Sequence, residues 1–282
     1  MDDVMRTESL TAQMGDFNTQ STQKILNIFF IVDISGSMRF DGKIEAVNEA
    51  FTRMVPALRQ IQLDSISEFE LRIAIMTFDQ YARWIVAPTP IMEYNHEPIA
   101  CSQWVTYFSE AFKTLGEVMT SKAYMAHSGK IAEPYIMFMT DGYPTEDDIY
   151  QPALDELKQN GWFKNSRRFA VLIGPEAIDS DAARAAVAGF VSNPDEGIID
   201  AADAEAIAAS VQAKTIHEVA NMTKHAVDAG QTGGSSGSSG GFSGFEGGDG
   251  GFGGGSGSGN DGFGDDPFDF AGFDDFDDSS FI

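Results

Sequence analysis

The sequence has one cysteine, few basic residues and no long apolar run, and each shortage excludes a class of protein. The lone Cys101 cannot form an internal disulfide, which is typical of a chain from a reducing compartment. No stretch approaches the ~20 apolar residues of a membrane helix. The N-terminus also lacks the basic start and apolar run of a secretory signal. We therefore expect a cytoplasmic protein without membrane contact.

Basic residues are the second shortage. Lys and Arg number 18 against 43 Asp and Glu, which gives a net charge of -25 at pH 7. Such a chain is repelled by a phosphate backbone and by an anionic lipid surface. We therefore expect no direct nucleic-acid partner. Apolar residues make up 43% of the chain, which is enough for a substantial core.

Composition divides the chain into three parts. Residues 1–22 are polar and predict a flexible N-terminal arm. Residues 229–282 are rich in Gly and Ser and contain ten Asp and Glu but no Lys or Arg, which predicts a disordered tail. The folded domain should occupy residues 23–228.

Within this domain, short apolar runs alternate with amphipathic stretches. The expected strands are 24–33, 70–78, 82–87, 134–139, 168–173 and 197–200. The expected helices are 43–62, 105–121, 150–160, 181–190 and 204–225. This alternation predicts a three-layer α/β fold with a doubly wound, mostly parallel sheet, and the close pair 70–78 and 82–87 predicts one antiparallel edge strand. Pro56 should kink the 43–62 helix or end it early.

Polar side chains follow two of the predicted strands. Asp33, Ser35 and Ser37 come at the end of the first, and Thr140 and Asp141 end a later one. Ligands of such sheets bind outside the carboxyl ends of the strands. Carboxylate and hydroxyl oxygens suit Mg²⁺, and also Mn²⁺ or Ca²⁺, better than Zn²⁺.

A simpler interpretation of these residues stays open. Asp and Ser often accept hydrogen bonds from free N–H groups at turns and helix starts. For Asp33 or Asp141 alone, capping explains the pattern as well as metal binding does. Asp79, at the end of the strand 70–78, is interpreted as part of the hairpin turn.

These motifs resemble a known family. Residues 33–37 (DISGS) resemble the DxSxS element of the von Willebrand factor A (vWA) domain, and residues 140–142 (TDG) resemble its later TDG element. Together they resemble a metal-ion-dependent adhesion site (MIDAS). The resemblance covers residues 24–226 and is strongest to the bacterial intracellular type associated with tellurite resistance (TerY-like).

The resemblance implies a ligand set. In the family, two serines and a threonine contact Mg²⁺ directly, and two aspartates hold it directly or through water. Here these would be Ser35, Ser37, Asp33 and Asp141. The threonine would be Thr106, in the loop before the second large helix, with Thr89 as the weaker alternative.

The implied function is an intracellular adaptor or scaffold, not an enzyme, in a stress-response or kinase and phosphatase signalling set. The metal would bridge to an Asp or Glu of a partner protein. The alternative is a Mg²⁺-dependent phosphohydrolase that uses Asp33, but no further catalytic acid or lysine is evident at the strand ends. The four histidines lie in no recognisable motif.

The tail contains nine of the 22 phenylalanines, spaced among aspartates. It is either a solvating tail or a short linear motif on a tether. As a hypothesis, Asp274 or Asp277 occupies the metal site of the same or a neighbouring chain, with adjacent Phe residues as anchors. Tethering would make even a weak contact effective.

Overall fold

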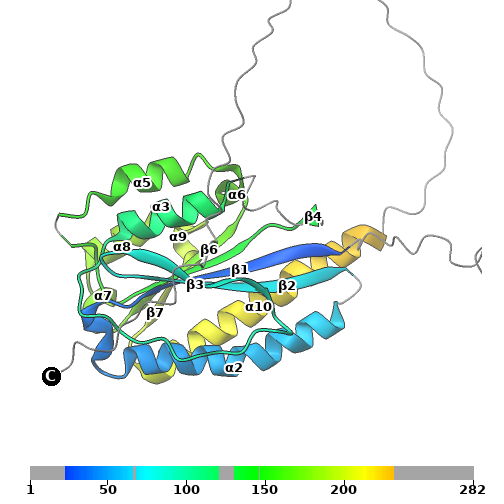
Figure 1. The fold of residues 1–282 in the computed structure, drawn as a ribbon, viewed down its shortest axis with the longest axis horizontal. Coiled ribbons are helices and arrows are strands. Elements are labelled where there is room, and N and C mark those ends of the chain that lie inside the picture. The colour runs from blue at the N-terminus through cyan, green and yellow to red at the C-terminus, as the bar shows by residue number, and fades with distance from the viewer. Residues whose placement is uncertain (1–22, 66–67, 121–129, 146, 232–282) are drawn as a thin grey trace, which may run out of the picture.

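A computed structural model describes residues 23–65, 68–120, 130–145 and 147–231. One mixed sheet lies between two layers of helices (Figure 1). Its strands are β1 (Lys24–Asp33), β2 (Phe69–Phe78), β3 (Ala82–Pro90), β4 (Lys130–Ile131), β5 (Tyr135–Thr140), β6 (Arg167–Ile173) and β7 (Ile198–Ala201). Their order is β3-β2-β1-β5-β6-β7, and the short β4 also pairs with β1. Only β2 and β3 pair antiparallel within the described chain. The predicted fold class is confirmed.

The helical elements cover both faces of this sheet. They are η1 (Gly36–Arg39), α2 (Lys43–Asp64), α3 (Phe108–Val118), α5 (Tyr150–Leu157), α6 (Gly161–Lys164), α7 (Pro175–Ile178), α8 (Asp181–Ala188), α9 (Pro194–Gly197) and α10 (Ala204–Gln231). Helices α2 and α10 pack together on one face, while α3, α5 and α8 contribute to the core on the other (Figure 1).

Strand β1 is buried on both faces, as its continuous apolar sequence predicts. Successive side chains of a strand point to opposite faces. Phe30 and Val32 accordingly join the core under α2 and α10, while Phe29 and Ile31 join the core under α3 and α5. This central position holds the end of β1 rigidly at the carboxyl edge of the sheet.

An aromatic cluster fixes the start of α3 against the same edge. The ring of Phe108, the first residue of α3, lies 5.8 Å from that of Phe78 in β2 and 4.9 Å from that of Phe138 in β5. All three side chains are fully buried. The loop that precedes α3 is therefore anchored beside the ends of β2 and β5.

Pro56 does not end α2, so the expectation of an early end is wrong. The helix continues to Asp64. Pro56 faces solvent, and its missing N–H deprives only the exposed Thr52 of its helical partner, so water can bond that carbonyl. Buried Val55 and Leu58 pack into the core on either side of the proline and hold the helix together.

Other helices also differ from expectation at their ends. The expected helix 150–160 ends at Leu157, and the expected helix 181–190 ends at Ala188. Helix α3 begins at Phe108 and not near 105, because the Tyr107 N–H donates to the carbonyl of Asp79 at 2.9 Å. Helix α10 continues past the predicted end at 225 to Gln231. The predicted arm, residues 1–22, and the tail from residue 232 onward lie outside the described residues. No helix in the described part combines the length and the apolar composition needed to cross a membrane.

Candidate metal centre

Four of the five predicted ligands form one hydrogen-bonded cluster. Strands β1 and β5 are parallel neighbours, so their carboxyl ends lie side by side. The Ser37 hydroxyl donates to Asp141 Oδ1 at 2.8 Å, and the hydroxyl oxygens of Ser35 and Ser37 are 3.2 Å apart. From the end of β5, the Thr140 hydroxyl donates to Asp33 Oδ2 at 2.7 Å. Residues about a hundred positions apart thus place their oxygens at one point of the sheet edge.

Asp33 is fully buried within this cluster. Burial, together with the nearby charge of Asp141, raises the pKa of the Asp33 carboxyl to about 7, although hydrogen bonds from Ser35 and Thr140 act in the opposite direction. Both Asp33 oxygens are used, since Oδ1 accepts the Ser35 N–H at 2.8 Å. Two facing carboxylates in a buried position are a setting that a nearby cation stabilises.

The turn after β1 explains why both serines reach the cluster. The short helix η1 begins at Gly36, whose N–H donates to the carbonyl of Trp104 at 3.1 Å. Ser35 lies at the N-cap position of η1, but its side chain makes no capping bond. The capping interpretation therefore holds for Asp33, which accepts the Ser35 N–H, and does not account for the two serine hydroxyls.

The loop of Thr106 lies directly against this turn. The N–H of Ser102 donates to the carbonyl of Ile34 at 2.7 Å, which adds a second backbone bond beside that of Gly36. Thr106 is buried, and its backbone exchanges two hydrogen bonds with Thr145, in the loop after β5. The N-cap of α3 is Tyr107 with no side-chain cap, so Thr106 does not cap that helix.

Thr89 does not belong to this group. It lies in edge strand β3 opposite Ile73, whereas Asp33 lies opposite Phe78 on the other side of β2. The five residue steps from Ile73 to Phe78 correspond to about 16 Å along the strand. Of the two candidate threonines, only Thr106 is in a loop at the carboxyl edge.

Lys43 is a member of the site that the sequence interpretation missed. Its Nζ lies 2.8 Å from Asp141 Oδ2, and the two side chains are 9% and 1% exposed. A signal was present in the helical spacing, since Lys43 is on the same stripe of α2 as buried Val47, Ala50 and Met54. A lysine at a core position of a helix needs a buried anion as its partner. The aspartates already proposed as metal ligands were the candidates for that anion.

Asp79 has the predicted role in the hairpin turn. Its Oδ1 accepts the Tyr81 N–H at 2.8 Å, and its own N–H donates to the Tyr81 carbonyl at 2.9 Å. The side chain is fully buried and lies 3.7 Å from the Arg83 guanidinium. Its carbonyl also accepts the Tyr107 N–H, so this turn supports the loop of Thr106.

Large apolar side chains are exposed in the loops that carry the site. Phe40 is 61% exposed, Trp104 57%, Val105 45% and Tyr143 56%. We call these four residues the apolar rim. Phe40 directly follows η1, Trp104 and Val105 precede Thr106, and Tyr143 follows the TDG run. Exposed aromatic residues of this kind are typical anchors of protein interfaces.

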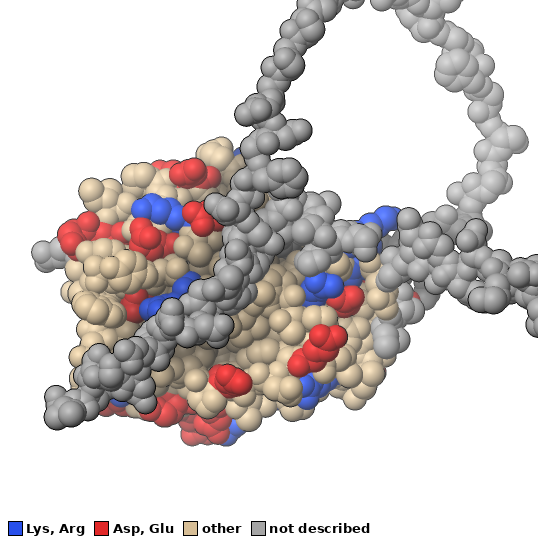
Figure 2. Space-filling view, viewed as in Figure 1, with Lys and Arg blue, Asp and Glu red and all other residues tan. Residues whose placement is uncertain are grey.

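Charged side chains show no comparable grouping on the face seen in Figure 2. Basic residues there lie singly among acidic and uncharged ones and form no patch.

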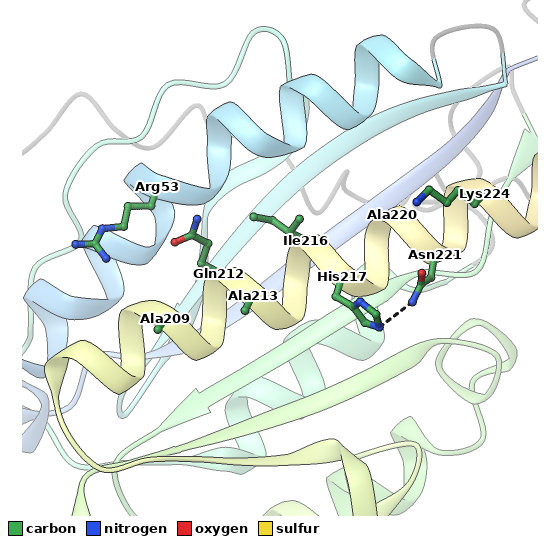
Figure 3. Close-up of a pocket in the computed structure, with 9 residues that line it drawn as sticks. All are labelled: Arg53, Ala209, Gln212, Ala213, Ile216, His217, Ala220, Asn221 and Lys224. Carbon is green, nitrogen blue, oxygen red and sulfur yellow. Dashed lines mark hydrogen bonds between the residues drawn. The ribbon is translucent and has the colours of Figure 1, made fainter.

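A recess of about 600 Å³ lies away from the site, along helices α2 and α10 (Figure 3). It is lined by Arg53 of α2 and by a series of α10 residues. In it, His217 points to Asn221, with 2.9 Å between the ring Nε2 and the amide nitrogen. His96 is bonded instead to Asn48 at 3.1 Å. Neither of these histidines is bonded to the oxygen cluster.

No protein-family model matches the sequence, and no curated protein is matched by it. Solved structures do resemble the fold. The open conformation of the pilus adhesin SpaC from Lactobacillus rhamnosus GG has a TM-score of 0.51 and 16% identity, over 70% of this chain and 31% of that chain. Proximal thread matrix protein 1 from the mussel byssus has a TM-score of 0.48 and 11% identity, over 72% of this chain and 47% of that chain.

A von Willebrand factor type A protein from Catenulispora acidiphila has a TM-score of 0.45 and 14% identity, over 69% of this chain and 42% of that chain. The present chain thus spans between about a third and a half of the length of these proteins. At such low identity, the likeness to SpaC concerns the fold alone.

Proposed function

We propose that this chain is a Mg²⁺-dependent protein–protein interaction module with a metal-ion-dependent adhesion site. Ser35, Ser37 and Thr106 would hold the metal directly, and Asp33 and Asp141 directly or through water. The observation that carries the proposal is the 2.8 Å bond between Ser37 and Asp141, which joins the DISGS turn to the TDG loop. The all-oxygen donor set fits Mg²⁺, and Mn²⁺ or Ca²⁺ would also suit it.

The donor set also indicates what the partner contributes. When bound, the cation supplies a positive charge that mostly neutral hydroxyl ligands leave available to a further carboxylate. An Asp or Glu of a partner protein is therefore the expected ligand. Because the apolar rim lies in the loops that carry the site, this acid should be flanked by apolar side chains.

The chain itself contains a sequence of this kind. Phe273, Asp274, Phe276 and Asp277 alternate aromatic and acidic residues in the C-terminal segment. Helix α10 runs from the carboxyl edge back along the sheet, and its 28 residues correspond to about 42 Å. A flexible chain of the length and Gly- and Ser-rich composition found between Gln231 and Asp274 would span roughly 36 Å. The segment can therefore return to the site of its own chain and compete with a partner.

The cellular role rests on the motif resemblance alone. The likeness of the DISGS and TDG runs to TerY-like proteins favours an intracellular adaptor in a stress-response set that includes kinases or phosphatases. The likeness of the fold to a pilus adhesin is compatible with an adhesive function but concerns the fold only.

The alternative, a phosphohydrolase that uses Asp33, has less support. Lys43 supplies the cation that such an enzyme would need beside its carboxylates. However, Asp33 is fully buried, so its carboxylate is not exposed to a substrate. Neither His96 nor His217, the two histidines whose side chains the structure describes, is hydrogen-bonded to the oxygen cluster.

The test combines metal binding with affinity capture. Ser37→Ala removes one ligand from an exposed position and should leave the fold intact. Glu117→Ala, on the exposed face of α3, is the matched control. We expect Mg²⁺ to bind wild type and the control in calorimetry, and a protein to be captured by both only in Mg²⁺ and not in EDTA. The proposal would be contradicted if Ser37→Ala bound Mg²⁺ as tightly as wild type, or if the same protein were captured in EDTA as in Mg²⁺.

The tail has a separate test. Deletion of residues 232–282 should increase the affinity for the captured partner, because the competing acidic segment is gone. Unchanged or weaker partner binding would show that the segment does not cap the site.

A further inference from the structure

Lys43 is a buried cation at the candidate metal centre that the proposed ligand set does not use. Its Nζ is 2.8 Å from Asp141 Oδ2, while the other oxygen of the same carboxylate accepts the Ser37 hydroxyl. Asp141 is therefore shared between the lysine on one side and the serine turn on the other. Both the lysine and the aspartate are almost completely buried.

The surrounding backbone is shaped to admit this lysine. Lys43 is the first residue of α2 and follows Gly42, which has a φ of 70°. Gly174, after β6, has a φ of 84°, and a Cβ there would lie only 3.1 Å from Lys43 Cε. The same added atom would lie 3.4 Å from a carboxylate oxygen of Glu176. The ammonium group thus lies in a space between Asp141 and the turn after β6.

A buried lysine is costly unless it is paired, so its position calls for an explanation. Asp33 and Asp141 are two acids in close proximity, and in the absence of metal their charges oppose each other. Lys43 offsets one of them. Among the four groups at the oxygen cluster itself, a divalent cation and the ionised Asp33 and Asp141 sum to zero charge, and Lys43 brings that sum to +1.

We propose that Lys43 is a fixed internal counter-ion that weakens metal binding and strengthens carboxylate binding by the loaded site. The proposal rests on the metal site proposed above. Lys43 holds the metal-free site together by neutralising Asp141. Once metal is bound, the lysine repels it, and the same excess positive charge attracts the acid of a partner. Lys43 thus lowers the affinity for the metal and raises the affinity of the metal-loaded site for a carboxylate. A purely structural role would not change the two affinities in opposite directions.

The first measurement is a calorimetric Mg²⁺ titration of wild type, Lys43→Gln and Lys43→Met. Gln keeps an N–H donor for Asp141 without the charge, whereas Met removes both. Lys113→Met, at a 56% exposed lysine of α3, changes the net charge equally and serves as control. We expect both Lys43 variants to bind Mg²⁺ roughly tenfold more tightly than wild type, and the control to match wild type.

The second measurement uses acetate as the carboxylate probe. At saturating Mg²⁺, acetate should raise the unfolding temperature of wild type more than that of Lys43→Gln. Mg²⁺ affinities that do not differ between wild type and Lys43→Gln would overturn the role of Lys43 while leaving the metal site in place. An absence of Mg²⁺ binding in every chain would overturn both. Tighter Mg²⁺ binding without a weaker acetate effect would refute the partner half of the proposal.

Discussion

Asp33→Asn should stabilise the metal-free protein although it removes a predicted metal ligand. The carboxyl of Asp33 is fully buried and faces Asp141, which makes its ionised form costly. Asparagine has nearly the same shape. Its amide oxygen can accept the Ser35 N–H as Oδ1 does now, and its NH₂ can donate to the Thr140 hydroxyl, which then donates to the Gly142 carbonyl.

The size and sign of the effect follow from the pKa of Asp33. It rises from an ordinary 3.8 to about 7 in the folded chain, and this difference corresponds to an upper limit of about 4 kcal/mol. Between these two pH values the folded chain keeps a proton that the unfolded chain releases. The free energy of unfolding of wild type therefore falls as pH rises, and the loss is complete above about pH 7. The asparagine of the variant does not titrate, so its stability lacks this dependence on pH.

Urea unfolding in EDTA at several pH values measures the difference directly. We expect Asp33→Asn to exceed wild type by about 1–4 kcal/mol at pH 8, and the difference to shrink toward pH 4. Mg²⁺ at a hundred times its dissociation constant should then add about 2.7 kcal/mol to wild type and little to the variant. A variant that is less stable than wild type at pH 8 in EDTA, or a difference that is independent of pH, would refute the reasoning.

Three further predictions concern particular positions. Gly174→Ala should lower the free energy of unfolding by about 1–3 kcal/mol in a urea titration, because the φ of Gly174 is positive and the added Cβ meets Lys43. Gly142→Ala should be nearly neutral in the same titration, since no atom lies within 4 Å of a Cβ added there. Pro56→Ala should raise the unfolding temperature, since it restores a helical hydrogen bond at a solvent-facing position, and no change would mean that water already satisfies that carbonyl fully. Trp104→Ala should leave stability and Mg²⁺ affinity unchanged but reduce the amount of partner protein captured. Undiminished capture would mean that Trp104 of the apolar rim does not contribute to the interface.

The fold could be predicted because its signals are local. The continuous apolar run of β1 and the helical spacing of α2 each indicate their structure without reference to the rest of the chain. The boundaries were harder because they depend on distant partners. The start of α3 is set by a bond from Tyr107 to Asp79, and the persistence of α2 beyond Pro56 is set by buried neighbours on both sides. Neither contact has a sequence signature.

The candidate site likewise contains residues that local signals predict and residues that depend on distant contacts. Asp33, Ser35, Ser37 and Asp141 end parallel neighbouring strands, so topology alone brings them together. The choice of Thr106 depended on motif likeness. In the structure, the backbone bonds between its loop and the serine turn, and the place of Thr89 in edge strand β3, distinguish the two threonines. The backbone bonds join segments about seventy residues apart, and the periodicity of apolar residues along the sequence does not indicate such contacts.

The net negative charge of this chain bears on the role proposed for Lys43. A protein with a net charge of -25 repels an acidic partner at long range, although salt at physiological strength confines that repulsion to about 8 Å. Within that distance only local cations can reverse the sign. At the proposed site, a divalent metal alone would be balanced by Asp33 and Asp141, whereas the metal together with Lys43 would not. The same acidic composition that argues against nucleic acid therefore makes a built-in lysine beside the proposed metal ligands the simplest way to attract a carboxylate.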